Sequence, residues 1–285
     1  MVKLITSTQE LLKTRSAETE VIGFVPTMGN LHAGHISLLE AALKDFDHVY
    51  FSIFVNPTQF GPNEDFNQYP RTLEKDLKLI EDLLINYPGK EVVVYSPKHP
   101  QEVYTDDIKN RVISVKGLKD IIEGAIRPGH FDGVATVVFR LFELVKPYKT
   151  YFGLKDYQQF LVIKKMIQDL NLPIMIQGMP IIREPTGLAL SSRNQYLSPQ
   201  QKEKSLLLNY GLKQIEDTLA GDKLNIPVAR ELITKLKNDC NWNYLELRDA
   251  DTLDEDLSSS SKVTILGVYQ LGTTRLLDNR QMELK

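Results

Sequence analysis

Cysteine is almost missing from this sequence, and so are the signals that would place the protein in or across a membrane. Cys240 is the only cysteine among 285 residues, so no disulfide can form within the chain, which suits a reducing compartment. No apolar run approaches the roughly 20 residues that a membrane-spanning helix needs. Residues 1–6 lack the pattern of a signal peptide. We therefore expect a cytoplasmic protein without a membrane partner.

An excess of charge of either sign is missing as well. The chain has 34 Lys and Arg residues against 37 Asp and Glu residues, a formal net charge of −3. This balance gives no electrostatic reason to expect nucleic acid or an anionic membrane as a partner. Hydrophobic residues make up 42% of the sequence, which is ordinary for a globular protein. At roughly 100–200 residues per domain, we expect one large domain or two unequal ones.

Short apolar runs alternate with helical patterns over the first two thirds of the chain. The runs predict strands at residues 21–25, 49–55, 92–95 and 151–152, and one further strand that includes residues 174–176 and 181–182. Helical spacing predicts helices at about residues 34–44, 73–84, 133–145 and 157–170. This alternation predicts an α/β fold with a Rossmann-like parallel sheet domain over residues 1–182. Ligands of such sheets bind at the carboxyl ends of the strands.

The pattern changes after Ile182, where a polar, turn-rich stretch begins. Ser198, Pro199 and Gln201 then form a helix start with a capping box. Helices are predicted at about residues 199–219 and 226–239, and strands at 244–248, 262–269 and 274–277. We expect residues 183–285 to form a smaller C-terminal α+β domain that acts as a lid.

Residues 26–35 lead from the first predicted strand into a helix. The start of a helix offers free backbone N–H groups and a partial positive charge to an anion. Gly29 and Gly34 remove side chains where a ligand must come close. His32 and His35 lie on one face of the first turn and can donate hydrogen bonds to phosphate oxygens. An isolated pair of this spacing would more often be capping or surface histidines, and a two-histidine metal site lacks nearby co-ligands.

Two further segments carry groups suited to a carboxylate or hydroxyl substrate. Asn56 and Gln59 follow the second predicted strand and can bind such a substrate without adding charge. Arg127 and His130 stand in a loop stiffened by Gly and Pro and could hold an anion. Taken alone, the segment with Asn56 and Gln59 is better explained as an ordinary Asn-Pro turn, and the segment with Arg127 and His130 is equally compatible with a surface turn.

Two cationic segments are suited to phosphate. Lys155 and Asp156 lie at a strand-to-helix junction, with Gln159 one helical turn further on. Lys155 is a compact cation, and Asp156 can cap the helix or meet a ribose or a metal. Residues 191–193, Ser-Ser-Arg, lie in the turn-rich stretch and could form a mobile phosphate clamp. A solvated Lys–Asp pair and a plain linker are the alternatives.

Taken in order, these motifs resemble a known family. The segment His32-Ala33-Gly34-His35 resembles the His-x-Gly-His signature of the nucleotidylyltransferase superfamily, which includes class I aminoacyl-tRNA synthetases. Within that superfamily, residues 26–32 are similar to the pantothenate synthetases, and the likeness extends over essentially the whole chain, including residues 248–250 and 275–279. The resemblance implies a homodimeric ligase that uses ATP and Mg²⁺ to activate pantoate as an acyl-adenylate and join it to β-alanine.

The resemblance also implies roles for individual residues. The catalytic set is His32, His35, Lys155, Ser191, Ser192 and Arg193, with proton donation assigned to His35. The ATP-binding set is Met28, Gly29, Asn30, Leu31, His32, Ala33, Gly34, His35, Gly153, Leu154, Lys155, Asp156, Ile182, Leu190, Ser191, Ser192 and Arg193. The set for pantoate and β-alanine is Gln59, Gln159, Asn56, Arg127 and His130. Leu154 stands where family members usually have a polar residue, so only its backbone can contribute.

The metal site is the least determined part of the prediction. Asp76, on the helix predicted at 73–84, is a candidate Mg²⁺ ligand, and a solvated surface acid is the alternative for it. ATP oxygens could instead hold most of the ion. Two other functions fit the first motif alone: a nucleotidylyltransferase that releases an AMP adduct, and a non-catalytic nucleotide sensor. AMP release that depends on β-alanine, and pantoate-dependent exchange of pyrophosphate into ATP, would separate the three.

Overall fold

The computed structural model describes residues 1–62, 64–104 and 111–285. The chain divides into two compact units. The first unit is Met1–Leu154 with Gln158–Pro180, and the second is Lys155–Tyr157 with Ile181–Lys285. The short segment Lys155–Tyr157 therefore belongs to the second unit although the chain on both sides of it belongs to the first.

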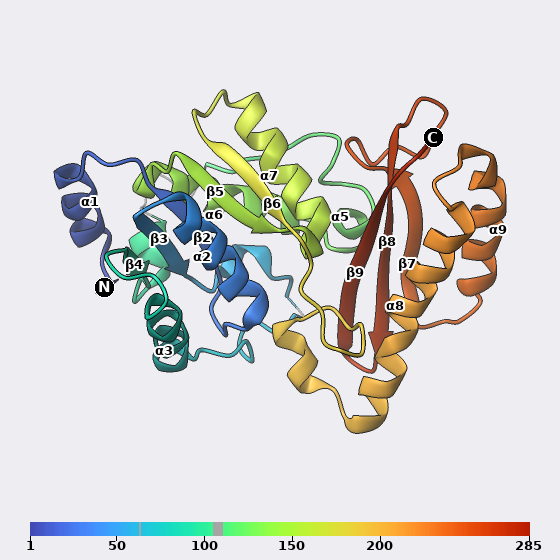
Figure 1. Ribbon diagram of the computed structural model, residues 1–285, viewed down its shortest axis with the longest axis horizontal. Coiled ribbons are helices and arrows are strands. Elements are labelled where there is room, and N and C mark those ends of the chain that lie inside the picture. Colours follow the sequence, from blue (N-terminus) through green and yellow to red (C-terminus); the bar gives the residue numbers. More distant parts are fainter. Residues whose placement is uncertain (63, 105–110) are drawn as a thin grey trace. The chain divides into compact units, whose positions relative to one another are not determined.

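The first unit is built on a six-stranded parallel sheet (Figure 1). Its strands are β1 (Val2–Ile5), β2 (Gly23–Thr27), β3 (His48–Ile53), β4 (Glu91–Tyr95), β5 (Lys149–Gly153) and β6 (Met175–Met179). Its helices are α1 (Thr8–Ala17), α2 (Ala33–Asp45), α3 (Leu73–Leu84), α4 (Pro100–Val103), α5 (Glu123–Ile126), α6 (His130–Val145) and α7 (Tyr157–Asp169). The 3-10 turn η1 (Pro57–Gln59) also belongs to this unit, whereas the turn η2 (Leu154–Asp156) begins in this unit and passes into the second at Lys155.

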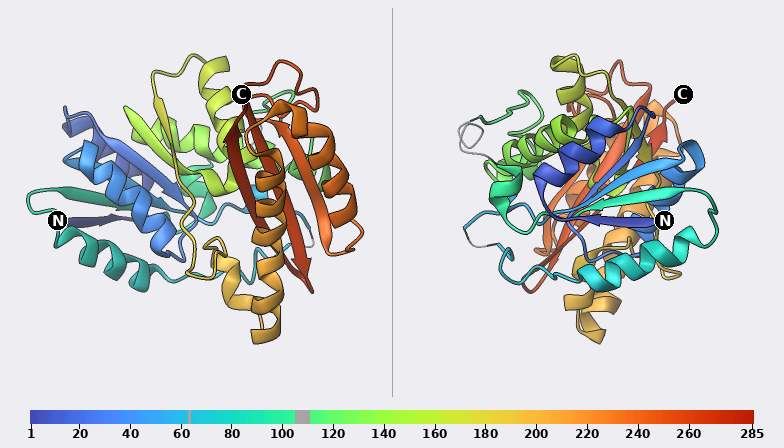
Figure 2. Two further views of the ribbon diagram at one scale, coloured as in Figure 1. Left: turned by 45° about the vertical axis from the view of Figure 1, so that its right-hand side comes forward. Right: turned by 90° about the vertical axis from the view of Figure 1, so that its left-hand side faces the viewer.

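Helices cover both faces of this sheet (Figure 2). Successive residues of a strand point to opposite faces. Val25 and Phe51 accordingly pack in one core cluster with Leu39 of α2, whereas Phe24 meets Phe142 of α6 with ring centroids 6.2 Å apart. Both faces of the central strands are buried, which explains why these strands read as continuous apolar runs in the sequence.

The strand order places the site of this unit. The order is β1-β4-β3-β2-β5-β6, so β2 lies between β3 and β5. The chain moves from β2 to one side to build β3 and β4, and later adds β5 and β6 on the other side. Such a switch point leaves a crevice at the carboxyl ends of the two strands that flank it. The segments that follow β2, β3 and β5 are those in which the sequence predicts the ligand-binding residues.

The second unit contains an antiparallel sheet of order β7-β8-β9. Its strands are β7 (Trp242–Asp249), β8 (Lys262–Leu271) and β9 (Thr274–Glu283), and its helical elements are α8 (Pro199–Leu219), α9 (Ile226–Leu236), η3 (Ser192–Tyr196) and η4 (Lys223–Asn225). Figures 1 and 2 show α8 and α9 along one face of the sheet. Leu212 and Ile215 of α8 share a core cluster with Ile265 and Tyr269 of β8. The predicted fold class, a Rossmann-like α/β domain with a smaller α+β domain, is confirmed.

Several predicted elements differ from the observed ones. β1 and α1 were not predicted, and β6 ends at Met179, so residues 181–182 do not continue it. Pro180 explains that end, because proline cannot donate a ladder hydrogen bond. α9 ends at Leu236 rather than 239, and β9 runs on to Glu283. Within the described residues, no helix is both long enough and apolar enough to cross a membrane.

Candidate active site

The turn after β2 depends on a glycine. Gly29 has φ +81°, and a Cβ there would lie 2.9 Å from the Ile53 side chain and 3.1 Å from the Asp76 carboxylate. Asn30 follows with φ 50°, also in the left-handed region. The side chain of Thr27 accepts a hydrogen bond from the Gly29 N–H at 3.2 Å. The turn therefore brings the chain back close against β3 before α2 begins.

Asp76 of α3 holds this turn in place. Its side chain is buried, with 1% of the residue exposed. One carboxylate oxygen accepts the Asn30 N–H at 3.0 Å, and the other accepts the Leu31 N–H at 2.8 Å and the Thr72 hydroxyl at 3.1 Å. The interpretation of Asp76 as a solvated surface acid is wrong. Among the described residues, no group of three or more His, Cys, Asp or Glu side chains could hold a metal ion.

The two histidines form the start of α2. His32 is the N-cap, and its Nδ1 accepts a hydrogen bond from the Gly34 N–H at 3.1 Å. Nδ1 of His35 accepts from the His32 N–H at 3.3 Å, and the ring centroids lie 4.1 Å apart. Because each Nδ1 accepts from the backbone, each neutral ring must carry its proton on Nε2. Helix capping and phosphate binding by these histidines are therefore compatible, because capping uses Nδ1 of each ring and places the donor proton on Nε2.

Asn56 organises the loop after β3. It is buried, with 1% exposed, and its Oδ1 accepts from the Thr58 N–H and hydroxyl and from the Tyr104 hydroxyl at 2.8 Å. Burial raises the pKa of Tyr104 to about 12, so the phenol stays a neutral donor. Nδ2 of Asn56 donates to Oε1 of Gln59 at 3.3 Å, and Nε2 of Gln59 contacts Sδ of Met28 at 2.9 Å. Gln59 thus connects the loop after β3, to which it belongs, with the segment that follows β2.

Arg127 and His130 hold the backbone of Gln59. Nδ1 of His130 donates to the Gln59 carbonyl at 2.8 Å, and a nitrogen of Arg127 donates to the same oxygen at 3.3 Å. The Arg127 guanidinium also makes a bidentate pair with Glu64, with both N–O distances 2.6 Å. The charge of Arg127 is therefore matched by a carboxylate within the loop, and its observed contacts support Gln59.

Protonation states in this cluster follow from the same contacts. Burial and the neighbouring Arg127 lower the pKa of His130 from its ordinary 6.5 to about 4. A neutral ring with its proton on Nδ1 can donate to Gln59 and accept from Arg127 on Nε2, at 3.0 Å. Burial alone would raise the pKa of Glu64, but the hydrogen bonds from Arg127 outweigh it, and the pKa is lowered. The cluster is a charged pair with one neutral imidazole.

Helix α6 packs closely against the loop that contains Asn56 and Gln59. A Cβ on Gly133 would lie 2.3 Å from the Thr58 carbonyl oxygen and 2.9 Å from Cα of Gln59. Asn56 donates to the Gly133 carbonyl at 3.2 Å, which ties the helix to the loop. Only glycine permits this approach, because both contacts are with backbone atoms.

The end of β5 contributes a third segment to this edge. The side chain of Leu154 lies against Gly178 of β6, where a Cβ would come within 2.6 Å of it. Leu154 therefore makes an apolar contact with the neighbouring strand. Gln158, on α7, is buried and receives the Glu123 N–H at 3.1 Å, while its own amide donates to the carbonyls of Leu118 and Ile121. Gln159 is half-buried.

The remaining predicted phosphate-binding residues belong to the second unit. Nζ of Lys155 lies 3.7 Å from the Asp156 carboxylate, and the Lys155 carbonyl accepts from the Asn279 side chain at 2.8 Å. Residues 182–190 form a hairpin, closed by the Leu190 N–H donating to the Ile182 carbonyl at 3.0 Å. Ser191 then caps η3, with its hydroxyl accepting from the Arg193 N–H.

The structure thus forms two groups of predicted site residues. In the first unit, residues 28–35, Asn56, Gln59, Arg127 and His130 gather around the ends of β2 and β3. In the second unit, Asn279 donates to the Lys155 carbonyl, and its neighbour Asp278 pairs with Arg183 in the hairpin that precedes residues 191–193. Sequence reasoning missed the supporting residues, which are Glu64, Gln158, Arg183, Asp278 and Asn279. Glu64 gave no signal in the sequence, whereas residues 275–279 were singled out without a role.

Comparison with known proteins adds independent information. The sequence model described as pantoate-beta-alanine ligase matches residues 1–281. The pantothenate synthetase of Acetivibrio thermocellus is 41% identical over 287 residues, which covers 100% of this chain and 99% of that protein. The pantothenate synthetase of Acinetobacter baumannii is 44% identical over 272 residues, which covers 95% of this chain and 94% of that protein.

Solved structures give the same result. The pantothenate synthetase of Thermus thermophilus matches with a TM-score of 0.86 and 38% identity, covering 98% of this chain and 99% of that one. The pantoate-beta-alanine ligase of Francisella tularensis, described as complexed with beta-gamma ATP and beta-alanine, matches with a TM-score of 0.76 and 33% identity, covering 98% and 97%. With both units matched over their full length, the chain belongs to the pantothenate synthetase, or pantoate–β-alanine ligase, family, and it is an enzyme that joins pantoate to β-alanine.

Proposed function

We propose that this chain uses ATP to activate pantoate before the ligation. A carboxylate oxygen of pantoate attacks the α-phosphorus of ATP, the bond between the α- and β-phosphates breaks, and pyrophosphate leaves. The amine of β-alanine then attacks the acyl carbon of the pantoyl adenylate. The carbon–nitrogen bond of pantothenate forms, AMP leaves with the electron pair of the broken acyl–oxygen bond, and the amine proton is released.

The observation that supports this proposal best is the paired imidazoles at the start of α2. Each Nδ1 accepts from the backbone, so each ring offers an Nε2–H donor. Such donors stabilise negative charge as it builds on phosphate oxygens. The Gly29 turn and the N-terminus of α2 add backbone N–H groups and a partial positive charge at the same place.

The other site residues keep the roles that the resemblance implies. Gln59 and Gln159 would bind the hydroxyl and carboxylate groups of pantoate and β-alanine. Lys155 and residues 191–193 would contact the phosphates of ATP, and their unit would close over the labile adenylate to exclude water. The contacts of Asn56, Arg127 and His130 support a different part for these three: they hold Gln59 in place.

The part of the chain that the structure describes forms no ready site for Mg²⁺. Both Asp76 oxygens accept backbone N–H groups, and the described residues contain no cluster of metal ligands. We propose that Mg²⁺ arrives with ATP and is held mainly by phosphate oxygens, as is common for this ion. We also propose a homodimer, which sedimentation of the purified chain would test.

One assay tests the reaction sequence. Purified protein is supplied with ATP, Mg²⁺, pantoate and β-alanine, and each is omitted in turn. Exchange of pyrophosphate into ATP should require pantoate but not β-alanine, and AMP release should require both. Lys155→Ala and His35→Ala should each lower the rate by roughly 10²–10³-fold, the usual effect of losing one donor to transition-state charge. Near-normal turnover in either variant would reject its assigned role.

A further inference from the structure

Residues 275–279 have no assigned role in the activation or ligation of pantoate, yet two of them are buried and polar. Asp278 and Asn279 are neighbours on β9, and each has 2% of its surface exposed. Buried polar groups are costly unless they are paired. The partners of these two residues therefore indicate what the two residues are for.

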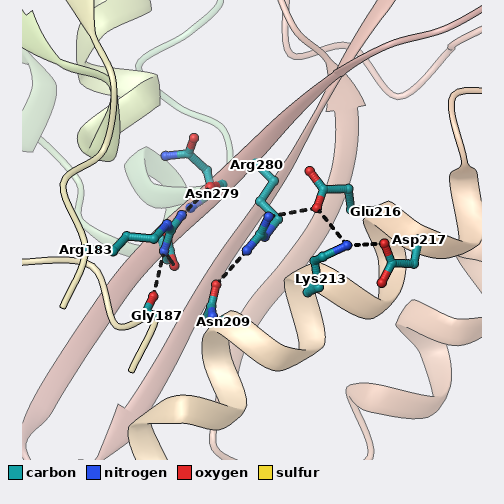
Figure 3. Close-up of polar contacts among 9 residues, drawn as sticks. Arg183, Gly187, Asn209, Lys213, Glu216, Asp217, Asn279 and Arg280 are labelled. Carbon is teal, nitrogen blue, oxygen red and sulfur yellow. Dashed lines mark hydrogen bonds and ion pairs between the residues drawn. The ribbon is translucent and has the colours of Figure 1, made fainter. Parts of the chain in front are cut away.

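Asp278 holds the hairpin that leads to Ser191. Its carboxylate makes a bidentate pair with Arg183, with N–O distances of 2.6 and 2.9 Å. The same guanidinium donates to the carbonyls of Gly187, at 3.1 Å, and Asn279, at 3.3 Å (Figure 3). Gly187, at the hairpin turn, has φ +92°, so the turn can be made only by a residue that tolerates this conformation.

Asn279 holds the other segment, Lys155. Its side-chain Nδ2 donates to the Lys155 carbonyl at 2.8 Å, and its backbone N–H donates to Asp278 at 2.7 Å. Gln281 donates to Oδ1 of Asn279 at 3.4 Å, which orients the amide so that its NH₂ group points to Lys155. The backbone position from which the Lys155 ammonium extends is thus fixed by a strand residue.

The strand that carries both residues is firmly held. β9 pairs with β8 in unbroken register from Thr274 to Glu283. Arg280, the next residue along, bonds Glu216 at 2.7 Å and Asn209 at 2.8 Å, both on α8 (Figure 3). Because β9 is bonded to both β8 and α8, it can hold Lys155 and the hairpin before Ser191 at a constant separation.

We propose that Asp278 and Asn279 are positioning residues, which keep Lys155 and residues 191–193 in register so that both reach the phosphates of one nucleotide. This inference rests on the proposed assignment of those segments to ATP. Reaction rates are sensitive to such placement, because an error of about 1 Å can cost roughly a hundredfold in rate. Two segments far apart in the sequence would otherwise have to be ordered separately each time ATP binds.

The test compares Asn279→Ala with Asn241→Ala, a matched control. Asn241 lies in the same unit and also loses a side-chain amide hydrogen bond, to Asp239 at 2.6 Å, but it touches neither segment. For Asn279→Ala, we expect kcat of the pantoate-dependent pyrophosphate exchange to fall about ten- to a hundredfold. The KM for β-alanine, measured in the complete ligation reaction, should stay unchanged. Asn241→Ala should keep the parental kcat. A purely structural role would lower the unfolding temperature of both variants and leave kcat per folded molecule unchanged.

Arg183→Lys is the second variant, in case Asn279→Ala does not fold. Lysine keeps the charge but loses the planar bidentate geometry, so the exchange rate should fall while the chain stays folded by circular dichroism. A folded Asn279→Ala or, failing that, a folded Arg183→Lys with the parental kcat would overturn the inference. Absence of exchange in the unsubstituted enzyme would instead overturn the proposed function, which keeps the two failures distinct.

Discussion

Replacing Gly133 with alanine should lower the activity of the enzyme, although Gly133 has no side chain and takes no direct part in the reaction. The added Cβ would lie 2.3 Å from the Thr58 carbonyl oxygen, whereas ordinary contacts begin near 3.4 Å. Relief requires a movement of about 1 Å. The movement must fall on backbone, because the next two atoms are the carbonyl carbon of Thr58 at 2.6 Å and Cα of Gln59 at 2.9 Å. Since the Gln59 carbonyl is held by His130 and Arg127, the strain is transmitted to the residue proposed to bind both pantoate and β-alanine.

The magnitude follows from that displacement. A shift of about 1 Å in a positioning group should lower kcat/KM for pantoate roughly a hundredfold. Overpacking should also reduce the free energy of unfolding by about 1–3 kcal/mol. The assay is AMP formation at limiting pantoate, with urea unfolding as the measure of stability.

Gly61→Ala is the matched control for this substitution. It lies in the same loop, and its added Cβ would meet Glu64 at an ordinary distance of 3.6 Å. We expect Gly61→Ala to keep kcat/KM within a few fold of the parent. A folded Gly133→Ala enzyme with unchanged kcat/KM for pantoate would refute the claim that the approach of α6 sets the position of Gln59.

Three other predictions concern the loop and the histidines. Asp76→Asn should raise the KM for ATP about tenfold or more, because one of the two accepting oxygens becomes an NH₂ group and leaves the Asn30 or the Leu31 N–H without an acceptor. An unchanged KM would show that the turn does not need both of these hydrogen bonds. His35→Gln should retain more pyrophosphate exchange than His35→Asn, since only glutamine can place a donor where Nε2–H lies, and the reverse order would contradict the proposed tautomer. The pKa of His130 is about 4 in the folded chain against an ordinary 6.5, so the unfolded chain binds more protons between these values. The resulting stability is complete above about pH 6.5 and is lost as the pH falls toward 4, so His130→Asn should flatten the slope by up to about 1.4 kcal/mol per pH unit in urea titrations, and an unaltered slope would count against a neutral His130.

The parts of the fold that could be predicted are those with strong periodicity. β2, β3 and β4 are buried on both faces, so each reads as one apolar run, and the helices between them show clear helical spacing. The capping box that begins at Ser198 predicted the start of α8 to the residue. β1 was missed because it has only four residues, although Ser7 does cap the helix that follows.

The candidate site was predictable where backbone chemistry dictates the residue type. Gly29 and the two histidines show in the sequence because a strand, a turn and a helix must meet there. The supporting contacts were not predictable, since Glu64 meets Arg127 from 63 residues away and Asp278 meets Arg183 across 95. Partners this remote are brought together only by tertiary packing. Arg127 and His130 were identified by type but hold a neighbouring backbone carbonyl, which local sequence does not reveal.

Because Lys155–Tyr157 belongs to the second unit while the chain on both sides of it belongs to the first, the two units cannot be expressed as simple fragments. The polypeptide crosses from one unit to the other three times, so a single cut cannot separate them. A recombinant fragment that started at Ile181 would lack the Lys155 carbonyl, to which Asn279 donates, and also Tyr157, whose hydroxyl donates to the Ala250 carbonyl at 2.8 Å. Gene fusions, split-protein pairs and circular permutants of this enzyme should therefore keep the junction around residue 155 intact and place their new ends elsewhere.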